Sequence, residues 1–454
     1  MGRIPKESIK EWFKTGDRPT EEEFSKLIDE CYNIDNAATI DDIIKYVASC
    51  GFVTLEEFNN MHHEITEEEA NRLMDEIDIE GLWTLNINTA TYEVTMDGDI
   101  NAWLTYRDKL GRYAMTNDGK ARKLNRDDSS LLEDGSEYDA SSVHIMTRFP
   151  RLYFTCVNDG DLATITLSES EFTGCKSFDE QWIGSYLGAF VDNALVSRAD
   201  LSPRHDSSIY YFWKCAQVNG SDWGLSDYRQ RQMMMVIYLC EFLSMNSQLN
   251  LGLGMTGNGN NWTHTDGSIV GVVVNAKTGA TSVLGDHCGK VDFTESGQTA
   301  NYACHVSLFG VEDPYGWFDE VCQGIYFGNS ENESQDGTEC FIYEGNRLPT
   351  KDELATHPSG IYRQITRLTS GGWIKKLIWD TNLDIIPAEL GGSSVDGHGD
   401  FYRSNTKGQM MLCGGYAGSG ASCGIALSYT QYTLAIIGTS IVSRLAYYGN
   451  AEIV

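Results

Sequence analysis

The spacing of apolar residues divides the chain into a helical start and a longer part that is rich in strands. Between residues 4 and 79 the sequence has almost no glycine, is rich in glutamate and places apolar residues at helical intervals. Thr20, Thr54 and Thr66 are each followed three positions later by glutamate, which is the capping-box pattern of helix starts. Because each helix has only a narrow apolar stripe, we predict a helical segment that buries this stripe against a partner. A solvated helical cap without a partner is the alternative.

From Trp83 onward the pattern changes to alternating and β-branched stretches separated by glycine, asparagine and aspartate. One long helix, capped by Ser226 or Asp227, is apolar on most faces and is expected to pack under a sheet. We predict strands at residues 83–88, 92–98 and 163–167 and two more within 143–156, broken by Pro150, with a hairpin turn at Asp97–Gly98.

Composition and charge narrow the class of protein. The chain has 454 residues, of which 41% are hydrophobic, so it folds and is long enough for two or three domains. Its formal net charge of −31 repels phosphate backbones and anionic lipid, so no nucleic-acid partner is expected. Apolar runs such as Met233–Cys240 are too short to cross a bilayer, and no secretory signal opens the chain. The twelve cysteines are scattered without a C-x-x-C pair and are interpreted as reduced, mostly buried thiols.

Motifs for nucleotides and transition metals are weak in this sequence. The G-x-G-x-x-G match at Gly252–Gly257 follows a helix instead of a strand, and the glycine-rich segment 415–424 is more simply a turn-rich loop of a sheet. His62 and His63 adjoin on a predicted helix and so point to different faces, while Asp286–Cys288 are too close together to chelate as a set. No metal or cofactor site is predicted from them.

A partial calcium motif and the absence of a catalytic constellation complete this search. Asp380, Asn382 and Asp384, with Glu389, resemble the start of a calcium loop, but Ile385 occupies the position that requires glycine. A structural calcium therefore stays open, and no other cofactor is expected. No G-x-S-x-G elbow is present, and no cysteine has a histidine at a recognisable family spacing. We therefore do not expect an enzyme.

The C-terminal 45 residues alternate small residues with tyrosine, serine and threonine on a predicted sheet surface. Tyrosine offers a large contact area at a low entropic cost and serine offers hydrogen bonds, which together are typical of binding surfaces. An ordinary polar sheet face is the equal alternative. The candidate receptor-binding residues are Tyr416, Ser419, Ser422, Ser428, Tyr429, Gln431, Tyr432 and Thr433.

Several separated motifs resemble, in order, those of one family. They are VHIMTRFPRLYF (143–154), WIGSYLG (182–188), GSDWGLSDY (220–228), FGVEDPYGWFDEVCQG (309–324) and the stretch from GG (414–415) to IVSRLA (441–446). The family is that of phage and prophage tail-fibre or tail-tip proteins with a C-type lectin-like domain of the formylglycine-generating-enzyme type, which include the variable proteins of diversity-generating retroelements. The resemblance covers about residues 140–450, but Asp319–Val321 and Tyr416–Ala417 depart from the family's tryptophan-containing motifs.

The resemblance implies an α+β protein of three parts: a helical virion-attachment domain (1–79), a β-rich connector (80–140) and a C-type lectin-like receptor-binding domain (141–454). It implies no catalysis, and Cys413 and Cys423 are interpreted as core residues. It also implies that Gly424, Arg444 and Leu445 hold the sheet while the Tyr/Ser-rich positions face outward.

The first residues carry a second resemblance. The segment 4–20 is similar to the openings of virion proteins from phages of gut anaerobes, which implies docking to the particle through Ile4, Ile9, Trp12, Phe13, Phe24 and Leu27. The combined expectation is a non-catalytic bacteriophage tail-fibre or head-fibre protein for host attachment, assembled in the host cytoplasm and released by lysis. Its partners would be other virion proteins and a host cell-surface glycan or protein, and a homotrimer is expected because repeated tips gain avidity. A structural head or tail decoration protein, or a glycan-acting depolymerase or oxidase, are the alternatives.

Overall fold

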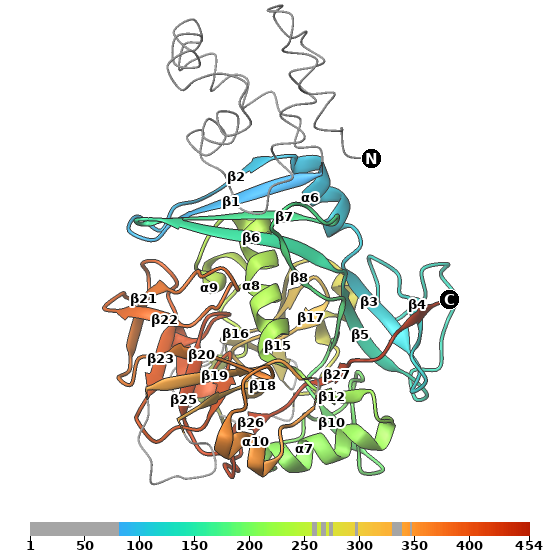
Figure 1. The fold of residues 1–454 in the computed structure, drawn as a ribbon. Coiled ribbons are helices and arrows are strands. Elements are labelled where there is room, and N and C mark those ends of the chain that lie inside the picture. Colours follow the sequence, from blue (N-terminus) through green and yellow to red (C-terminus); the bar gives the residue numbers. More distant parts are fainter. Residues whose placement is uncertain are drawn as a thin grey trace, which may run out of the picture.

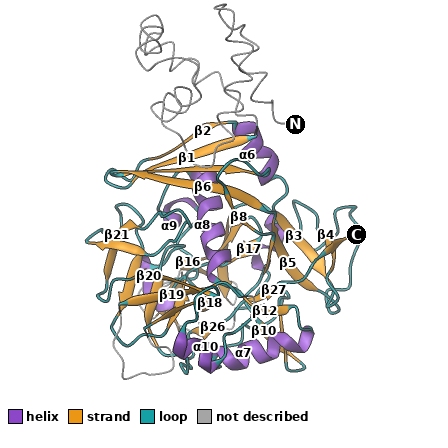
Figure 2. Ribbon diagram, in the orientation of Figure 1, coloured by secondary structure: helices purple, strands orange, loops and turns teal. Residues whose placement is uncertain are grey.

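The computed structural model is an α+β fold in which several curled sheets surround one buried helix, α8 (Tyr228–Phe242) (Figures 1 and 2). The α+β class expected from the sequence is therefore confirmed. The expected virion-docking residues from Ile4 to Leu27, and the whole segment 1–79, lie outside the described residues. The structure describes residues 81–256, 261–264, 269–271, 276–295, 298–328, 338–345 and 347–454.

An antiparallel sheet covers one end of α8 (Figure 1). Its strands alternate buried and exposed residues, so that Leu85 and its cross-strand partner Ile165 both face the core. Helix α6 (Ile100–Arg107) follows the second strand and adds Trp103 and Tyr106 to the same core. In sheet order the strands are β2 (Val94–Gly98), β1 (Leu82–Asn88), β7 (Leu162–Ser168), β6 (Leu152–Asp159) and β8 (Lys176–Phe178).

A second sheet joins distant parts of the chain. Its β3–β5 and β9–β27 pairings are antiparallel, and β28 closes one edge in parallel with β4. A short hairpin, β10 (Ala189–Val191) and β11 (Ala194–Val196), leads to helix α7 (Ile209–Ala216) and the 3-10 turn η2 (Gln217–Asn219). In order the strands are β12 (Trp223–Leu225), β27 (Leu445–Tyr447), β9 (Gln181–Gly184), β5 (His144–Phe149), β3 (Gly111–Met115), β4 (Lys120–Lys123) and β28 (Glu452–Ile453).

The remaining strands form two further sheets, the larger of which carries the C-terminal segment. The smaller has β14 (Ile269–Gly271), β13 (Asn261–His264), β16 (Gln298–Leu308) and β15 (Gly289–Glu295), with β17 (Val311–Glu312) also paired to β16. The larger has β20 (Tyr362–Thr366), β19 (Glu339–Tyr343), β18 (Asp319–Phe327), β24 (Met410–Cys413), β25 (Ser428–Tyr432), β23 (Phe401–Ser404), β21 (Gly372–Leu377) and β22 (Pro387–Leu390), with β26 (Ile441–Val442) beside β18. The other helical pieces are α9 (Ser247–Asn250), α10 (Lys351–Thr356), η3 (Ala280–Leu284) and η4 (Ala417–Ser422).

Helix α8 matches the long apolar helix predicted from the sequence. Asp227 caps it, because its side chain accepts a hydrogen bond from the Gln230 backbone while Gln230 bonds back to the Asp227 backbone. Most of its residues are buried, and the helix runs through the centre of the molecule between the sheets (Figure 1). A helix that buries most of its faces is stable only when other elements surround it in this way.

Two expectations of local organisation need correction. The first hairpin turns at residues 89–93, between β1 and β2, whereas Asp97 and Gly98 lie at the end of β2. The strands β1 and β3, placed in a connector of residues 80–140, are hydrogen-bonded to β7 and β5 from the segment after 140. The two segments contribute strands to the same two sheets. Which strands pair, and in which register, depends on contacts between distant residues, and the local pattern of apolar and polar residues does not determine it.

Candidate binding surface

The glycine-rich segment after β24 forms a tight surface turn, as the sequence predicts. Gly414 and Gly415 have φ values of 83° and 81°, in the left-handed region that favours glycine. A Cβ on Gly415 would also lie 2.8 Å from the Cys423 sulfur, so the close approach of the chain to its own return strand requires glycine. The turn η4 fills the space between β24 and β25.

Two of the eight candidate receptor-binding residues are not at the surface, which corrects the expectation that they face outward. Ser428 is 4% exposed and Tyr429 is 0% exposed. They lie on β25, an inner strand with β23 on one side and β24 on the other, and both of its faces are packed there. The Tyr429 hydroxyl forms a hydrogen bond with the hydroxyl of Ser419, and the two oxygens are 3.0 Å apart.

The other six candidates are half-buried and form two separate groups. Tyr416, Ser419 and Ser422 lie on and beside η4, at the Ser428 end of β25. Gln431, Tyr432 and Thr433 lie at the opposite end of that strand, roughly 13 Å along it at 3.3 Å per residue. The candidates that are close together in sequence therefore do not form one continuous surface.

The η4 turn is held in place from beneath. The Ala417 backbone N–H donates to the Trp317 carbonyl at 3.1 Å. The Gln248 side chain on α9 donates to the Gly420 carbonyl at 3.2 Å and fixes η4 against this short helix. A loop that is bonded on two sides is ordered before any ligand arrives, which reduces the entropic cost of binding.

Helix α9 adds exposed apolar area beside the η4 turn. Leu249, on α9, is 75% exposed, and Leu253, three residues after the helix ends, is 38% exposed. Ala421 at the tip of η4 is exposed as well. Aliphatic groups next to a tyrosine and two serine hydroxyls make a mixed surface of the kind that contacts other molecules. We call it the η4–α9 surface: Leu249, Leu253, Tyr416, Ser419, Ala421 and Ser422.

Arg444 connects three of the sheets. It is 0% exposed, and its guanidinium donates to both carboxylate oxygens of Glu320 at 2.9 Å. It also donates to four backbone carbonyl oxygens at 2.9–3.1 Å, those of Gly184, Ser185, Glu312 and Asp313. The expectation that Arg444 holds the sheet agrees with these bonds.

Gly424 and Leu445 also have structural positions. A Cβ on Gly424 would lie 1.8 Å from a carboxylate oxygen of Asp400, so no larger residue fits while Asp400 keeps its position. Asp400 needs that position because its other oxygen accepts from the Ala426 backbone at 2.8 Å. Leu445 is fully buried on β27.

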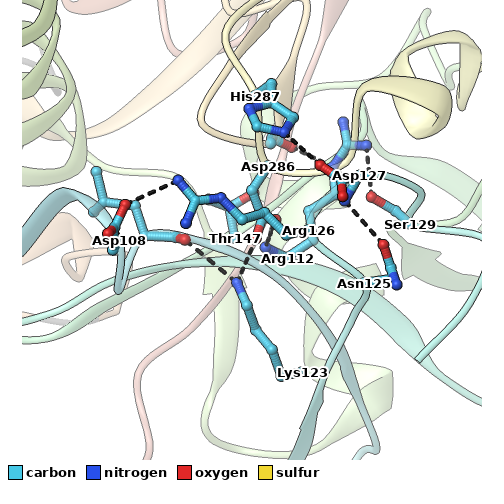
Figure 3. A network of polar contacts seen from close by, with 12 residues as sticks. Asp108, Arg112, Lys123, Asn125, Arg126, Asp127, Ser129, Thr147, Asp286 and His287 are labelled. Atoms are coloured by element: carbon cyan, nitrogen blue, oxygen red, sulfur yellow. Dashed lines mark hydrogen bonds and ion pairs between the residues drawn. The ribbon is translucent and has the colours of Figure 1, made fainter. Parts of the chain in front are cut away.

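A second polar network surrounds Asp286 (Figure 3). Asp286 accepts from the Arg112 backbone at 2.7 Å and forms an ion pair with Lys123 at 2.6 Å. The neighbouring His287 turns to the surface and pairs with Asp127 at 2.7 Å. Asp286 and His287 therefore contact different partners, and the network fastens β3 and β4 to the segment after η3.

A buried group of potential metal ligands was not found from the sequence. His305, Glu312 and Asp313 place their ligand atoms within 4.8 Å of one another. The Asp313 carboxylate contacts His305 Nδ1 at 2.6 Å and accepts from the Val306 backbone at 3.0 Å. The Glu312 oxygens accept from the backbone of Gly279 and of Thr281, each at 2.7 Å. Since each carboxylate oxygen already has a donor, the geometry favours a buried ion pair over a bound cation.

The partial calcium motif has a similar internal explanation. One Asp380 oxygen accepts from the backbone N–H groups of Asn382 and Asp384 and closes a turn. Both oxygens of Asp384 pair with the guanidinium of Arg363. Glu389 lies on β22 and pairs with Lys375 at 2.6 Å. These carboxylates are thus bonded to backbone N–H groups or to cations of the protein itself.

The cysteines of the described ranges are free thiols, and most are buried. Cys413 is 3% and Cys423 is 0% exposed, which agrees with their interpretation as core residues. The sequence did not indicate that Cys413 lies beside Cys322 and Arg231, because their proximity depends on the register between β18 and β24 and on the helix packed across them.

Comparisons with known proteins place no further constraint on the chain. No family model matches it, and no curated protein matches it. Among the described residues, no helix combines the length and apolarity needed to cross a bilayer.

Proposed function

We propose that this chain is a bacteriophage virion fibre protein that binds the host surface without catalysis through the η4–α9 surface. The observation that carries the proposal is this surface itself: Tyr416 and two serine hydroxyls stand on a bonded turn next to two exposed leucines. Such a surface supplies aromatic area, hydrogen bonds and aliphatic contact without first having to become ordered. The resemblance of the motifs in residues 140–450 to tail-fibre proteins supplies the biological setting.

The negative net charge of the chain favours some classes of host receptor over others. The net charge of −31 surrounds the molecule with a negative field, which opposes approach to polyanions such as teichoic acids or acidic capsules. A neutral glycan or an uncharged protein surface fits better, because tyrosine packs on sugar rings and serine bonds to their hydroxyls. Binding to such a receptor would change little with salt.

The test is the binding of the purified full chain to an array of neutral and acidic bacterial glycans and to a panel of bacterial cells. Tyr416→Ala is the informative variant and Tyr432→Ala, at the other end of β25, is the matched control. Loss of a central tyrosine contact costs about 2 kcal/mol, so binding by Tyr416→Ala should weaken roughly 30-fold while Tyr432→Ala binds as the wild type. Equal effects of both variants, or cleavage of the glycans, would overturn the proposal.

A further inference from the structure

Two positively charged side chains share one negatively charged side chain in the interior, between α8 and the larger sheet. Arg444 binds Glu320 through two hydrogen bonds, and Arg231 on α8 places Nη2 3.4 Å from the same carboxylate. Two guanidinium groups therefore share one carboxylate, and the side chains of Arg231 and Glu320 are only 8% and 3% exposed. A buried charge without a counter-charge is costly, so a second anion near Arg231 would be stabilised.

Cys413 is the group in position to be that anion. Cys413 and Arg231 line the same small cavity, and Cys322 is on the strand paired with that of Cys413. Among the described residues, Nη2 of Arg231 makes no hydrogen bond to an oxygen atom, so this end of the guanidinium remains available to the sulfur. A neighbouring arginine favours the thiolate, which is the form of a cysteine that reacts.

The direction of the pKa shift agrees with this geometry. The Cys322 thiol and the charge of Arg231 lower the pKa of Cys413 and outweigh the opposing effect of burial. Burial instead raises the pKa of Cys322, Cys340 and Cys423 above that of an ordinary thiol. Cys413 thus differs in kind from the other thiols of its sheet.

A small cavity borders Cys413. About 30 Å³ of space for a water-sized molecule is lined by Cys413, Arg231 and Ser428 together with apolar side chains. Two of these apolar residues, Ile385 and Ala426, are only half-buried, so this wall of the cavity is close to the surface. A peroxide is little larger than water and is the common oxidant that suits such a space.

Cys322 is placed to react with an oxidised Cys413. In the β18–β24 register Glu320 is opposite Cys413 and Cys322 is opposite Met411, so the two cysteines are diagonal neighbours on one face of the sheet. We propose that Cys413 and Cys322 form a peroxide-reactive thiol pair in the interior of this protein. This proposal does not depend on host binding.

The two steps balance without a further reagent. The Cys413 thiolate attacks one oxygen of hydrogen peroxide, the O–O bond breaks, and the products are a Cys413 sulfenic acid and hydroxide, with two electrons passing from sulfur to peroxide. The Cys322 thiol then attacks the oxidised sulfur, an S–S bond forms, and water leaves with the sulfenic oxygen and the thiol proton. The disulfide would join β18 to β24.

The experiment treats the folded full chain with dilute hydrogen peroxide, alkylates the remaining thiols at intervals and identifies the products by mass spectrometry. Cys413 should be consumed roughly tenfold faster than Cys340, a buried thiol of the same sheet that serves as the internal control. The product should be a peptide pair linked between Cys322 and Cys413.

Two variants separate the steps. In Cys322→Ser the oxidation should stop at a Cys413 sulfenic acid that dimedone labels, whereas Cys340→Ser should still form the disulfide. Near-ultraviolet circular dichroism of each variant verifies that it is folded. Consumption of Cys413 no faster than Cys340 in the wild-type chain, or an oxidised product in which Cys322 remains a free thiol, would overturn the proposal.

Discussion

Replacing Arg444 by methionine removes the guanidinium that connects three sheets while keeping a side chain of similar length. The change leaves Glu320 with Arg231 alone, at 3.4 Å, and withdraws a donor from four backbone carbonyl oxygens. A buried carbonyl oxygen that loses its donor costs about 1–3 kcal/mol, and Glu320 also loses its two 2.9 Å bonds, so we expect a total loss of at least about 3–5 kcal/mol. Since the stability of a domain is about 5–15 kcal/mol, Arg444→Met should lose a large part of it. Arg444→Lys keeps the charge but has three donors in place of five, so its loss should be smaller.

Urea unfolding followed by tryptophan fluorescence measures this loss as a shift of the midpoint. The matched control is Arg151→Met, which removes an exposed ion pair with Asp179 in which the side chains are 54% and 73% exposed. An exposed pair of this kind contributes at most about 1 kcal/mol. If Arg444→Met unfolded within about 1 kcal/mol of the wild type, or no differently from Arg151→Met, the inference that Arg444 holds the sheets together would be wrong.

Two further predictions concern glycine and histidine. Gly424→Ala should destabilise the chain by about 1–3 kcal/mol in the same urea assay, because its Cβ would meet the Asp400 carboxylate at 1.8 Å. The control is Gly438→Ala, which should be tolerated because the nearest contact of its Cβ would be 3.4 Å. Equal urea midpoints for the two variants would refute this prediction. Burial lowers the pKa of His144 to about 3 and of His398 to about 4, and Nδ1 of each ring has no hydrogen-bond partner in the described residues. The unfolded chain binds protons below about pH 6.5 while the folded chain does not, so each histidine should reduce stability by up to about 1.4 kcal/mol per pH unit as the pH falls from 6.5 towards 4. This prediction would be wrong if the urea midpoint of the wild-type chain did not change between pH 7 and pH 5. It would also be wrong if the midpoint of His144→Gln fell by as much as that of the wild type.

Local patterns predicted most of the elements because they depend on neighbouring residues. The cap at Asp227, the strands on either side of Pro150 and the turn after Gly415 all follow from chemistry within a few positions. The first hairpin was misplaced at Asp97–Gly98, because an aspartate–glycine pair also suits the end of a strand that leads into a helix.

The candidate site was predicted less well because exposure depends on sheet order. Tyr429 has the composition of a surface residue, but β25 lies between β23 and β24 and so buries it. Leu249 and Leu253 belong to a segment far from η4 in sequence, and the Gln248 contact with Gly420 that joins this segment to η4 could not be predicted from local patterns. The proximity of Cys413 to Cys322 likewise needs the strand register, which no spacing in the sequence reveals.

The most direct test of host binding compares phage particles that carry this chain with particles that carry its Tyr416→Ala variant. If the η4–α9 surface binds the host, both kinds of particle should assemble with equal yield and equal stability, and the variant particles should adsorb to host cells at least tenfold more slowly. Particles that fail to assemble would instead indicate a structural part of the virion. Adsorption at the wild-type rate would contradict the assignment of binding to the η4–α9 surface.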